Sequence, residues 1–397
     1  MASEIEMKTK HLRPRRSGFL PRSFHVVFVF VVLFGMYDTA LPKVSVTKQP
    51  KFMIIGYVFN RANIHDISAE KLTHINYAFA LVSKDGEIVL NNPEAPARLS
   101  QLQALKAKNP SLKIILSVGG WGADNFSDAA LSDTSRERFA RSAVGMIKRY
   151  ALDGIDLDWE YPGQPGPGIK YRPEDKENFT YLLKTVRQHI DTLSNERSRR
   201  STDRYTLTIA SAAGDYFKYT EMDKLHVYLD WINIMAYDFY TSSARTTGHH
   251  TGLYRSLSSG DSNEYGEASV KQHLDTGIPS RKLVLGAAFY GRSFSGVKPE
   301  NNGLYQLYDR YAGEHSYSAL TRDFINKQGF KRLWDDAAKA PYLWNAASAT
   351  FITYDDPESL KAKAEFVKSH RLGGLMYWEH SHDPAELLLS TIFERLR

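Results

Sequence analysis

Residues 153–162 read DGIDLDWEYP, and this stretch decides the fold that we expect for the whole chain. Asp156, Asp158 and Glu160 alternate here with apolar residues, which is the period of a β-strand. Because successive side chains of a strand point to opposite faces, the three acids share one face. Like charges this close cannot all ionise at neutral pH. The pattern therefore favours a site where one carboxyl stays protonated while its neighbour stays charged.

Two other interpretations of this acidic row are a solvated edge strand and a set of metal ligands. The apolar flanks and the Tyr161-Pro162 ending argue against an exposed edge. Hard cations prefer oxygen ligands arranged around a point, often from a loop, and a linear row offers this less readily. We therefore favour a catalytic strand.

The composition of the 397 residues is that of an ordinary globular enzyme, with 24% charged and 42% hydrophobic side chains. Much of the formal charge of +6 belongs to residues 1–40, and the rest of the chain keeps a net charge of +3. A nucleic-acid partner therefore loses its main support. The chain contains no cysteine, which excludes disulfides and thiolate metal sites.

The amino-terminal residues 1–40 combine basic side chains with a wholly apolar run at residues 26–34. The run is shorter than the ~20 residues of a membrane span and has the size of a signal-peptide core. We expect a secreted or periplasmic protein whose mature body does not contact a membrane. Because Asp38 disturbs the cleavage pattern, a signal anchor over residues 24–37 is the alternative. Residues 41–51 have the character of a polar linker.

Short apolar segments alternate with helical patterns through the rest of the chain. Strands are predicted at residues 52–58, 73–81, 113–118, 153–162, 205–212, 230–236, 282–289 and 373–377. Eight β–α units predict an α/β fold, a (β/α)8 TIM barrel over residues 52–397. An open doubly wound sheet is the alternative, but no glycine-rich nucleotide loop follows the first strand.

The connection after the seventh strand is far too long for a barrel loop. About 65 residues precede the helix that begins near Pro357, against the usual 2–6. Tyrosine-rich, strand-like pieces recur in it. We predict a small α+β insertion domain at residues 291–354, between strand seven and helix seven of the barrel.

Four segments resemble signatures of glycoside hydrolase family 18, the chitinase family. They are the acidic stretch (D-G-x-D-x-D-x-E), residues 117–120 (SVGG), residues 235–238 (MAYD) and residues 290–292 (YGR). The resemblance spans residues 52–396 and implies a chitinase of bacterial type that acts on chitin or N-acetylglucosamine oligosaccharides. It implies no metal and no cofactor, and we expect a monomer.

The resemblance also implies a mechanism in which the substrate supplies the nucleophile. Glu160 would protonate the glycosidic oxygen and later deprotonate water. Asp158 would orient the acetamide, Asp156 would share a proton with Asp158, and Tyr237 would hydrogen-bond the acetamide carbonyl. From the residues alone, Tyr237 is equally compatible with a buried, satisfied tyrosine.

A second group of residues would bind the sugar. It comprises Tyr57, Phe79, Gly120, Trp121, Tyr161, Met235, Asp238, Arg292 and Trp378. Four of them have a plainer interpretation: Tyr57 and Phe79 are compatible with core filling, Arg292 with a surface ion pair, and Gly120 with backbone shape.

Two histidine groups, His249-His250 and His380 with His382, look like metal ligands at first. The second pair has the residue types for zinc, but no third or fourth ligand is evident. We expect polar rim residues there.

Three other functions remain open from the sequence. One is a non-catalytic chitin-binding lectin, which the presence of Glu160 disfavours. Another is an enzyme of the same family acting on N-glycans or peptidoglycan, for which the catalytic residues would be the same. The third, a membrane-anchored structural protein, rests only on residues 26–37. The expected insertion favours long linear chitin, by analogy at the level of the fold.

Overall fold

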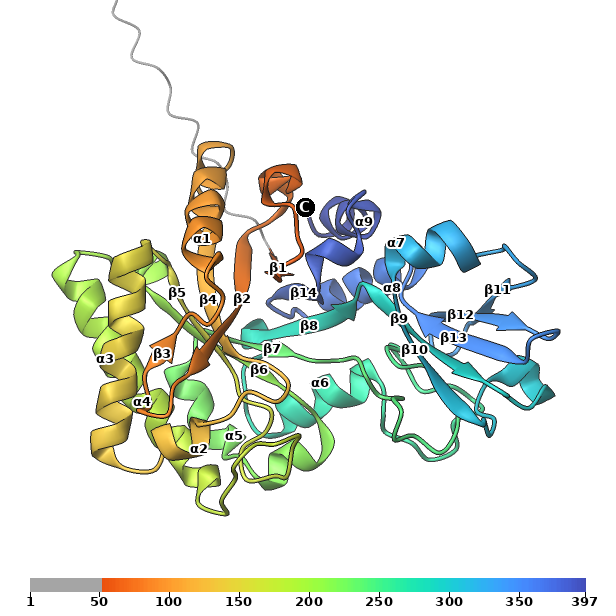
Figure 1. Cartoon of the computed structure of the whole chain (residues 1–397), viewed down its shortest axis with the longest axis horizontal. Coiled ribbons are helices and arrows are strands. Elements are labelled where there is room, and N and C mark those ends of the chain that lie inside the picture. Colours follow the sequence, from red (N-terminus) through yellow and green to blue (C-terminus); the bar gives the residue numbers. More distant parts are fainter. Residues whose placement is uncertain (1–51) are drawn as a thin grey trace, which may run out of the picture. The chain divides into compact units, whose positions relative to one another are not determined.

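The computed structural model describes residues 52–397, so the leader and linker predicted over residues 1–51 lie outside the described residues. Eight parallel strands surround a common axis, with helices packed around them (Figure 1). None of the helices within residues 52–397 has the length and apolar character that crossing a membrane requires.

The barrel is closed by the pairing of its first two strands. The strands are β1 (Met53–Val58), β2 (His74–Val82), β4 (Lys113–Gly119), β5 (Gly154–Asp158), β6 (Thr206–Ser211), β7 (Trp231–Ile234), β8 (Leu283–Ala288) and β14 (Gly374–Trp378). Their order is β1-β14-β8-β7-β6-β5-β4-β2, and β1 also pairs with β2. A short strand, β3 (Ile88–Val89), extends the edge of β2. The predicted (β/α)8 barrel is confirmed.

The helices lie outside the strands of the barrel, except for a short one in the segment between β8 and β14. They are α1 (Ala95–Ala104), α2 (Phe126–Ala129), α3 (Asp133–Tyr150), α4 (Asp175–Glu196), α5 (Met222–Leu225), α6 (Gly266–Asp275), α7 (Tyr317–Ala319), α8 (Pro357–Ser369) and α9 (Leu387–Leu396). Ser132 and Asp356 form capping boxes at α3 and α8, which satisfy backbone N–H groups that the first turn leaves free.

Strand alternation divides the apolar side chains of the barrel into two layers. Ile155, Leu157 and Trp159 face outward and belong to the large core between strands and helices. The opposite face of the strands fills the barrel, where Trp231 and Met376 belong to a separate apolar cluster. The acids of β5 therefore point into the barrel, because they alternate with residues of the outer core.

Residues 290–354 build a second sheet beside the barrel, drawn in blue in Figure 1. Its strands are β9 (Tyr290–Ser295), β10 (Arg310–Ser316), β11 (Lys331–Asp335), β12 (Ala340–Asn345) and β13 (Thr350–Tyr354), all antiparallel in the order β10-β9-β13-β12-β11. The sheet has an apolar cluster of its own around Phe294, Trp344 and Phe351. It begins one residue after Phe289, so it is fixed directly to the carboxyl end of β8.

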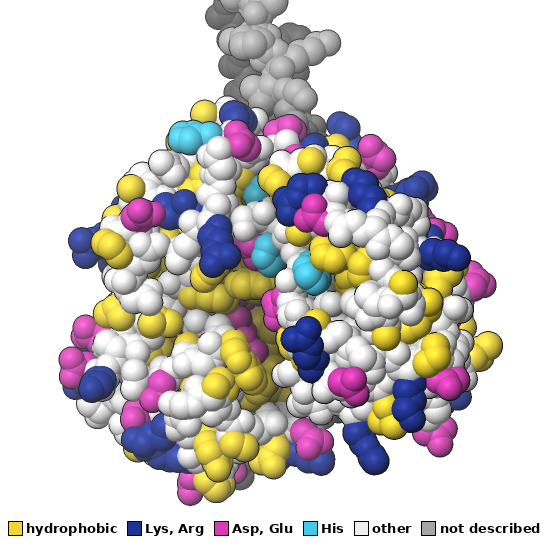
Figure 2. Space-filling model, turned by 45° about the vertical axis from the view of Figure 1, so that its right-hand side comes forward, with side chains coloured by type: hydrophobic (Ala, Val, Ile, Leu, Met, Phe, Trp, Pro, Cys, Tyr) yellow, Lys and Arg dark blue, Asp and Glu magenta, His cyan; other side chains and the backbone are white. Residues whose placement is uncertain are grey.

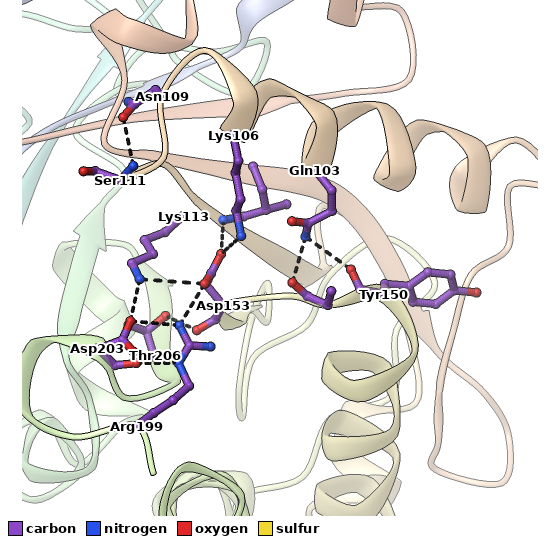
Figure 3. Close-up of polar contacts among 12 residues, drawn as sticks. Gln103, Lys106, Asn109, Ser111, Lys113, Tyr150, Asp153, Arg199, Asp203 and Thr206 are labelled. Carbon is purple, nitrogen blue, oxygen red and sulfur yellow. Dashed lines mark hydrogen bonds and ion pairs between the residues drawn. The ribbon is translucent and has the colours of Figure 1, made fainter. Parts of the chain in front are cut away.

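The amino-terminal end of β5 is held by a network of charges (Figure 3). Asp153 accepts hydrogen bonds from Lys106 at 2.6 Å, from Arg199 at 3.0 Å and from the backbone N–H of Ile114 at 2.9 Å. Lys113 lies 3.8 Å away. Burial raises the pKa of Asp153, but the hydrogen bond and charge of Lys106 lead the effects that bring it below its usual value.

Candidate active site

The acidic row occupies the carboxyl end of β5, where barrel enzymes place their active sites. Asp156 is fully buried, Asp158 is 5% exposed, and Glu160 beyond the strand end is partly exposed. Figure 2 shows a hollow on this molecule lined by hydrophobic and acidic side chains.

Asp156 lies deepest and is surrounded by hydrogen-bond donors. Its Oδ2 accepts from the hydroxyls of Tyr57 and Ser117, each at 2.8 Å. Its Oδ1 accepts from Thr208 Oγ1 at 2.6 Å and from Asn233 Nδ2 at 3.2 Å. Burial raises the pKa of Asp156, and these hydrogen bonds oppose the rise.

Asp158 and Glu160 have the opposite surroundings. Asp158 Oδ1 is buried without a hydrogen-bond partner among residues 52–397. Burial, with the charges of Glu160 and Asp156, raises the pKa of Asp158 well above its usual value. Burial raises the pKa of Glu160 to about 7; a hydrogen bond from Tyr161 opposes that rise, and the charge of Asp238 adds to it. A carboxyl with such a pKa can both donate and accept a proton near neutral pH.

Aromatic rings stand around these acids. Trp378 ends β14 and stacks on Phe79 at 5.5 Å between ring centroids, with Tyr57 at 5.8 Å. Trp121 is 67% exposed and meets Tyr161 edge-on at 6.1 Å. Large rings that remain uncovered beside polar groups are suited to packing on the C–H faces of sugars.

Gly120 explains part of this arrangement. Its φ of 92° lies in the region that favours glycine, and an added Cβ would come within 2.7 Å of the Phe79 ring. Any other residue at this position would displace the Phe79 ring and disturb its stacking on Trp378.

Asp238 and Arg292 form an ion pair that connects the barrel to the second sheet. Asp238 Oδ1 accepts from Arg292 Nε and from the Tyr290 hydroxyl, both at 2.6 Å. Arg292 also donates to Glu314 at 2.8 Å and to the Tyr311 hydroxyl at 2.6 Å. Burial raises the pKa of Asp238, but hydrogen bonds from His250 and Arg292 lower it far below its usual value. Asp238 therefore stays charged beside Glu160.

Tyr237 and Met235 follow the carboxyl end of β7 and lie against the same interior cluster as Phe79 and Trp378. Both pack on the apolar cluster inside the barrel, to which Trp378 also belongs. In the described part of the chain, the hydrogen-bond partner of the Tyr237 hydroxyl is Met376 Sδ, at a long distance of 3.9 Å. A strong hydrogen-bond donor is thus left with a weak protein acceptor.

The structure corrects the expectation that the histidines are rim residues. His249, His250 and His380 are at most 4% exposed, and only His382 reaches the surface. His249 pairs with Asp335 of the second sheet at 3.1 Å, and His250 Nε2 lies 3.2 Å from the Tyr290 carbonyl. Among residues 52–397, no group of three or more His, Asp or Glu side chains is arranged to hold a metal ion.

Sequence reasoning missed Thr208 and Asn233, two of the four donors to Asp156. A signal for both was present, because each interrupts a run of apolar residues at a position that strand alternation turns into the barrel. Most buried polar side chains are hydrogen-bonded to a partner, so a polar residue in such a run points to one.

Comparison with known proteins identifies the family of the chain. The model of Glycosyl hydrolases family 18 matches residues 53–383, so the chain belongs to this family. Fold and site thus define a glycoside hydrolase of family 18. The chain is 38% identical to Chitinase A1 of Niallia circulans over 87% of its own length and 58% of that relative. It is 32% identical to Chitinase B of Serratia marcescens, covering 82% of this chain and 76% of the relative.

Solved structures show the same likeness. A family 18 N-acetylglucosaminidase from Paenibacillus barengoltzii superposes with a TM-score of 0.81 at 40% identity, covering 87% of this chain and 99% of that one. Chitinase ChiA74 from Bacillus thuringiensis gives 0.81 at 36% identity, with 87% and 69% covered. The chain spans somewhat more than half of the first of these curated relatives.

Proposed function

We propose that the protein is a chitinase, which hydrolyses β-1,4 linkages between N-acetylglucosamine residues of chitin and chito-oligosaccharides. The observation that carries the proposal is the row Asp156, Asp158 and Glu160 at the mouth of the barrel. Its outermost member has a pKa of about 7 and lies near aromatic rings that can hold a sugar. The names of the bacterial relatives support the substrate.

The reaction would proceed in two steps with retention of configuration. Glu160 donates its proton to the glycosidic oxygen as the bond to the anomeric carbon breaks. The acetamide oxygen of the same sugar attacks that carbon and forms an oxazolinium ion. Glu160, now a carboxylate, removes a proton from water, which then opens the ring.

The other residues would act on the acetamide and the ring. Asp158 accepts the acetamide N–H, and the negative charge that Asp156 and Asp158 share through one proton balances the developing positive charge. The Tyr237 hydroxyl, whose partner among the described residues is the thioether of Met376, donates to the acetamide oxygen. Trp378 supports the sugar from below. Asp238, held in place by Arg292, keeps a negative charge close enough to raise the pKa of Glu160.

A second candidate is release of single N-acetylglucosamine units from chain ends. It is favoured by the likeness to the Paenibacillus N-acetylglucosaminidase, nearly all of whose chain is matched. A substrate bearing N-acetylglucosamine in N-glycans or peptidoglycan is the remaining alternative, because the same acids would serve it.

Products from chitohexaose, an N-glycopeptide and a muropeptide separate these possibilities. Chitinase activity gives oligomers of two or more sugars, and the exo-enzyme gives monomers. The variant Glu160→Gln is expected to lose about 10²–10⁴-fold in kcat while it still binds chitotetraose. The control is Glu196→Gln, a carboxyl at the exposed end of α4 whose nearest cation lies 3.7 Å away. A Glu160→Gln protein that keeps substantial turnover contradicts the mechanism.

The proposed place of action is outside the cytoplasm, in secreted or periplasmic form. The basic residues followed by the short apolar run of residues 26–34 support this. Detection of the mature protein in culture medium, with sequencing of its amino terminus, tests export and locates any cleavage.

A further inference from the structure

The interior of the barrel holds a polar layer directly beneath the acidic row. Tyr57 of β1, Ser117 of β4, Thr208 of β6 and Asn233 of β7 all reach Asp156 of β5. These five side chains are at most 2% exposed. Because they are buried, they are stabilised by hydrogen bonds to one another and not by bulk water. The direction of each hydrogen bond therefore decides which group can carry a charge.

Trp231 fixes the direction of this network from below. Its indole Nε1, which can only donate, lies 3.1 Å from Asn233 Oδ1. The two residues are two apart on β7 and therefore share the inner face. With Oδ1 used as the acceptor, the amide group Nδ2 must point the other way, toward Tyr57 and Asp156.

The amide then orients the tyrosine. Asn233 Nδ2 lies 3.3 Å from the Tyr57 oxygen and 3.2 Å from Asp156 Oδ1. Because the Tyr57 oxygen receives this N–H, its own proton is directed at Asp156 Oδ2, 2.8 Å away. Donors thus run in one direction, from Trp231 through Asn233 and Tyr57, and both oxygens of Asp156 are acceptors.

We propose that Trp231 and Asn233 are positioning residues that hold the negative charge of the acidic row on Asp156 and leave the shared proton on Asp158. The inference rests on the proposed hydrolase function, for which it supplies the resting protonation state. It agrees with the contrast between the two aspartates: Asp156 has four donors, whereas Asp158 Oδ1 has none among residues 52–397. A carboxylate is stable where donors converge, and an unpartnered buried carboxyl is better neutral.

Other titratable groups face this network from the neighbouring elements. Asp158 and Glu160 follow on the same chain segment, and Tyr237 beyond β7 is close enough to act on Tyr57 electrostatically. His74 of β2 packs edge-on against Trp231 at 4.7 Å between ring centroids. Burial lowers the pKa of His74 to about 4, so His74 is neutral throughout a titration begun above pH ~5.

The test is the pH dependence of kcat/KM on a soluble chito-oligomer for Trp231→Phe and Asn233→Leu. Loss of these donors raises the pKa of Asp156, so the row loses its negative charge at higher pH. The acid limb is expected to move upward by about one pH unit for Asn233→Leu and by less for Trp231→Phe. Ile115→Val is the matched control, because Ile115 packs in the same interior cluster and carries no polar side-chain atom.

A purely structural role predicts something else: lower thermal midpoints and lower activity at every pH, with both limbs unmoved. That outcome, in variants whose folding is verified by their thermal midpoints, overturns the proposal. Trp231→Phe keeps the ring that packs on His74, so it decides the question even if Asn233→Leu fails to fold. Wild-type protein without any turnover of chito-oligomers would instead contradict the proposed function.

Discussion

Asp153 and Asp158 stand at opposite ends of β5, and their surroundings give them opposite properties. Asp153 is met by Lys106 and Arg199, and its pKa lies below the usual value. Asp158 meets no cation in the described part of the chain, and burial raises its pKa well above that value. The same residue type therefore forms ion pairs at one end of the strand and has a raised pKa at the other, because, of the two, only Asp153 has cations beside it within residues 52–397.

The largest effect is expected from Asp158→Asn. Activity should fall about 10²–10⁴-fold, because an amide can neither exchange the shared proton with Asp156 nor take over the negative charge that balances the reacting sugar. The free energy of unfolding should stay the same or increase, since a neutral amide replaces a buried carboxyl without a partner. Kinetics on chito-oligomers and urea unfolding measure the two quantities. Full activity in this variant would contradict a catalytic role for Asp158, and with it the proposed functional difference between Asp158 and Asp153.

Asp153→Asn should show the reverse pattern. Removing one member of a largely buried ion cluster leaves Lys106 and Arg199 without their anion, which costs about 3 kcal/mol in the free energy of unfolding. Activity per folded molecule should change little, because the residue lies at the other end of the strand from Glu160. A large loss of kcat in fully folded Asp153→Asn would show that the two ends are coupled.

Stability should depend on pH in opposite senses at the two ends. The lowered pKa of Asp153 means that its contribution is complete above the unfolded value of ~3.9 and is lost as pH falls through the folded value. The pKa of Glu160 is raised to about 7, so its contribution is present below the unfolded value and lost as pH rises toward 7. Urea unfolding at pH 3, 5 and 8 should therefore show Glu160→Gln gaining stability over wild type with rising pH, whereas Asp153→Asn loses it.

Lys113→Met should have the smallest effect. Lys113 lies 3.8 Å from Asp153 and 2.9 Å from Asp203, and its side chain is 27% exposed, so Lys106 and Arg199 can compensate for its loss. The expected change is at most about 1 kcal/mol, and it should shrink in high salt. A loss as large as that of Asp153→Asn would indicate that Lys113, and not Lys106, is the principal partner.

Local pattern in the sequence predicted much of the barrel. Alternation placed Asp156, Asp158 and Glu160 on one side of a strand, and the repeat of strands and helices predicted closure. The roles of Arg292 and the histidines did not follow from pattern, because their partners come from distant segments. Arg292 joins Asp238 to Glu314 of the second sheet, and His249 joins a barrel loop to Asp335. No local spacing indicates such pairs.

What the sequence determined by itself is the order of chemical groups along each strand: which side chains face inward, and that three acids share a face. That follows from backbone geometry, which repeats every two residues. Only the tertiary structure decided which of these acids receives hydrogen bonds. Tyr57 and Asn233 reach Asp156 from 99 and 77 residues away, and closure of the barrel brings their donors to one carboxylate, whereas Asp158 Oδ1 has no donor within residues 52–397. A pKa depends on these neighbours and on burial, neither of which exists before the chain folds.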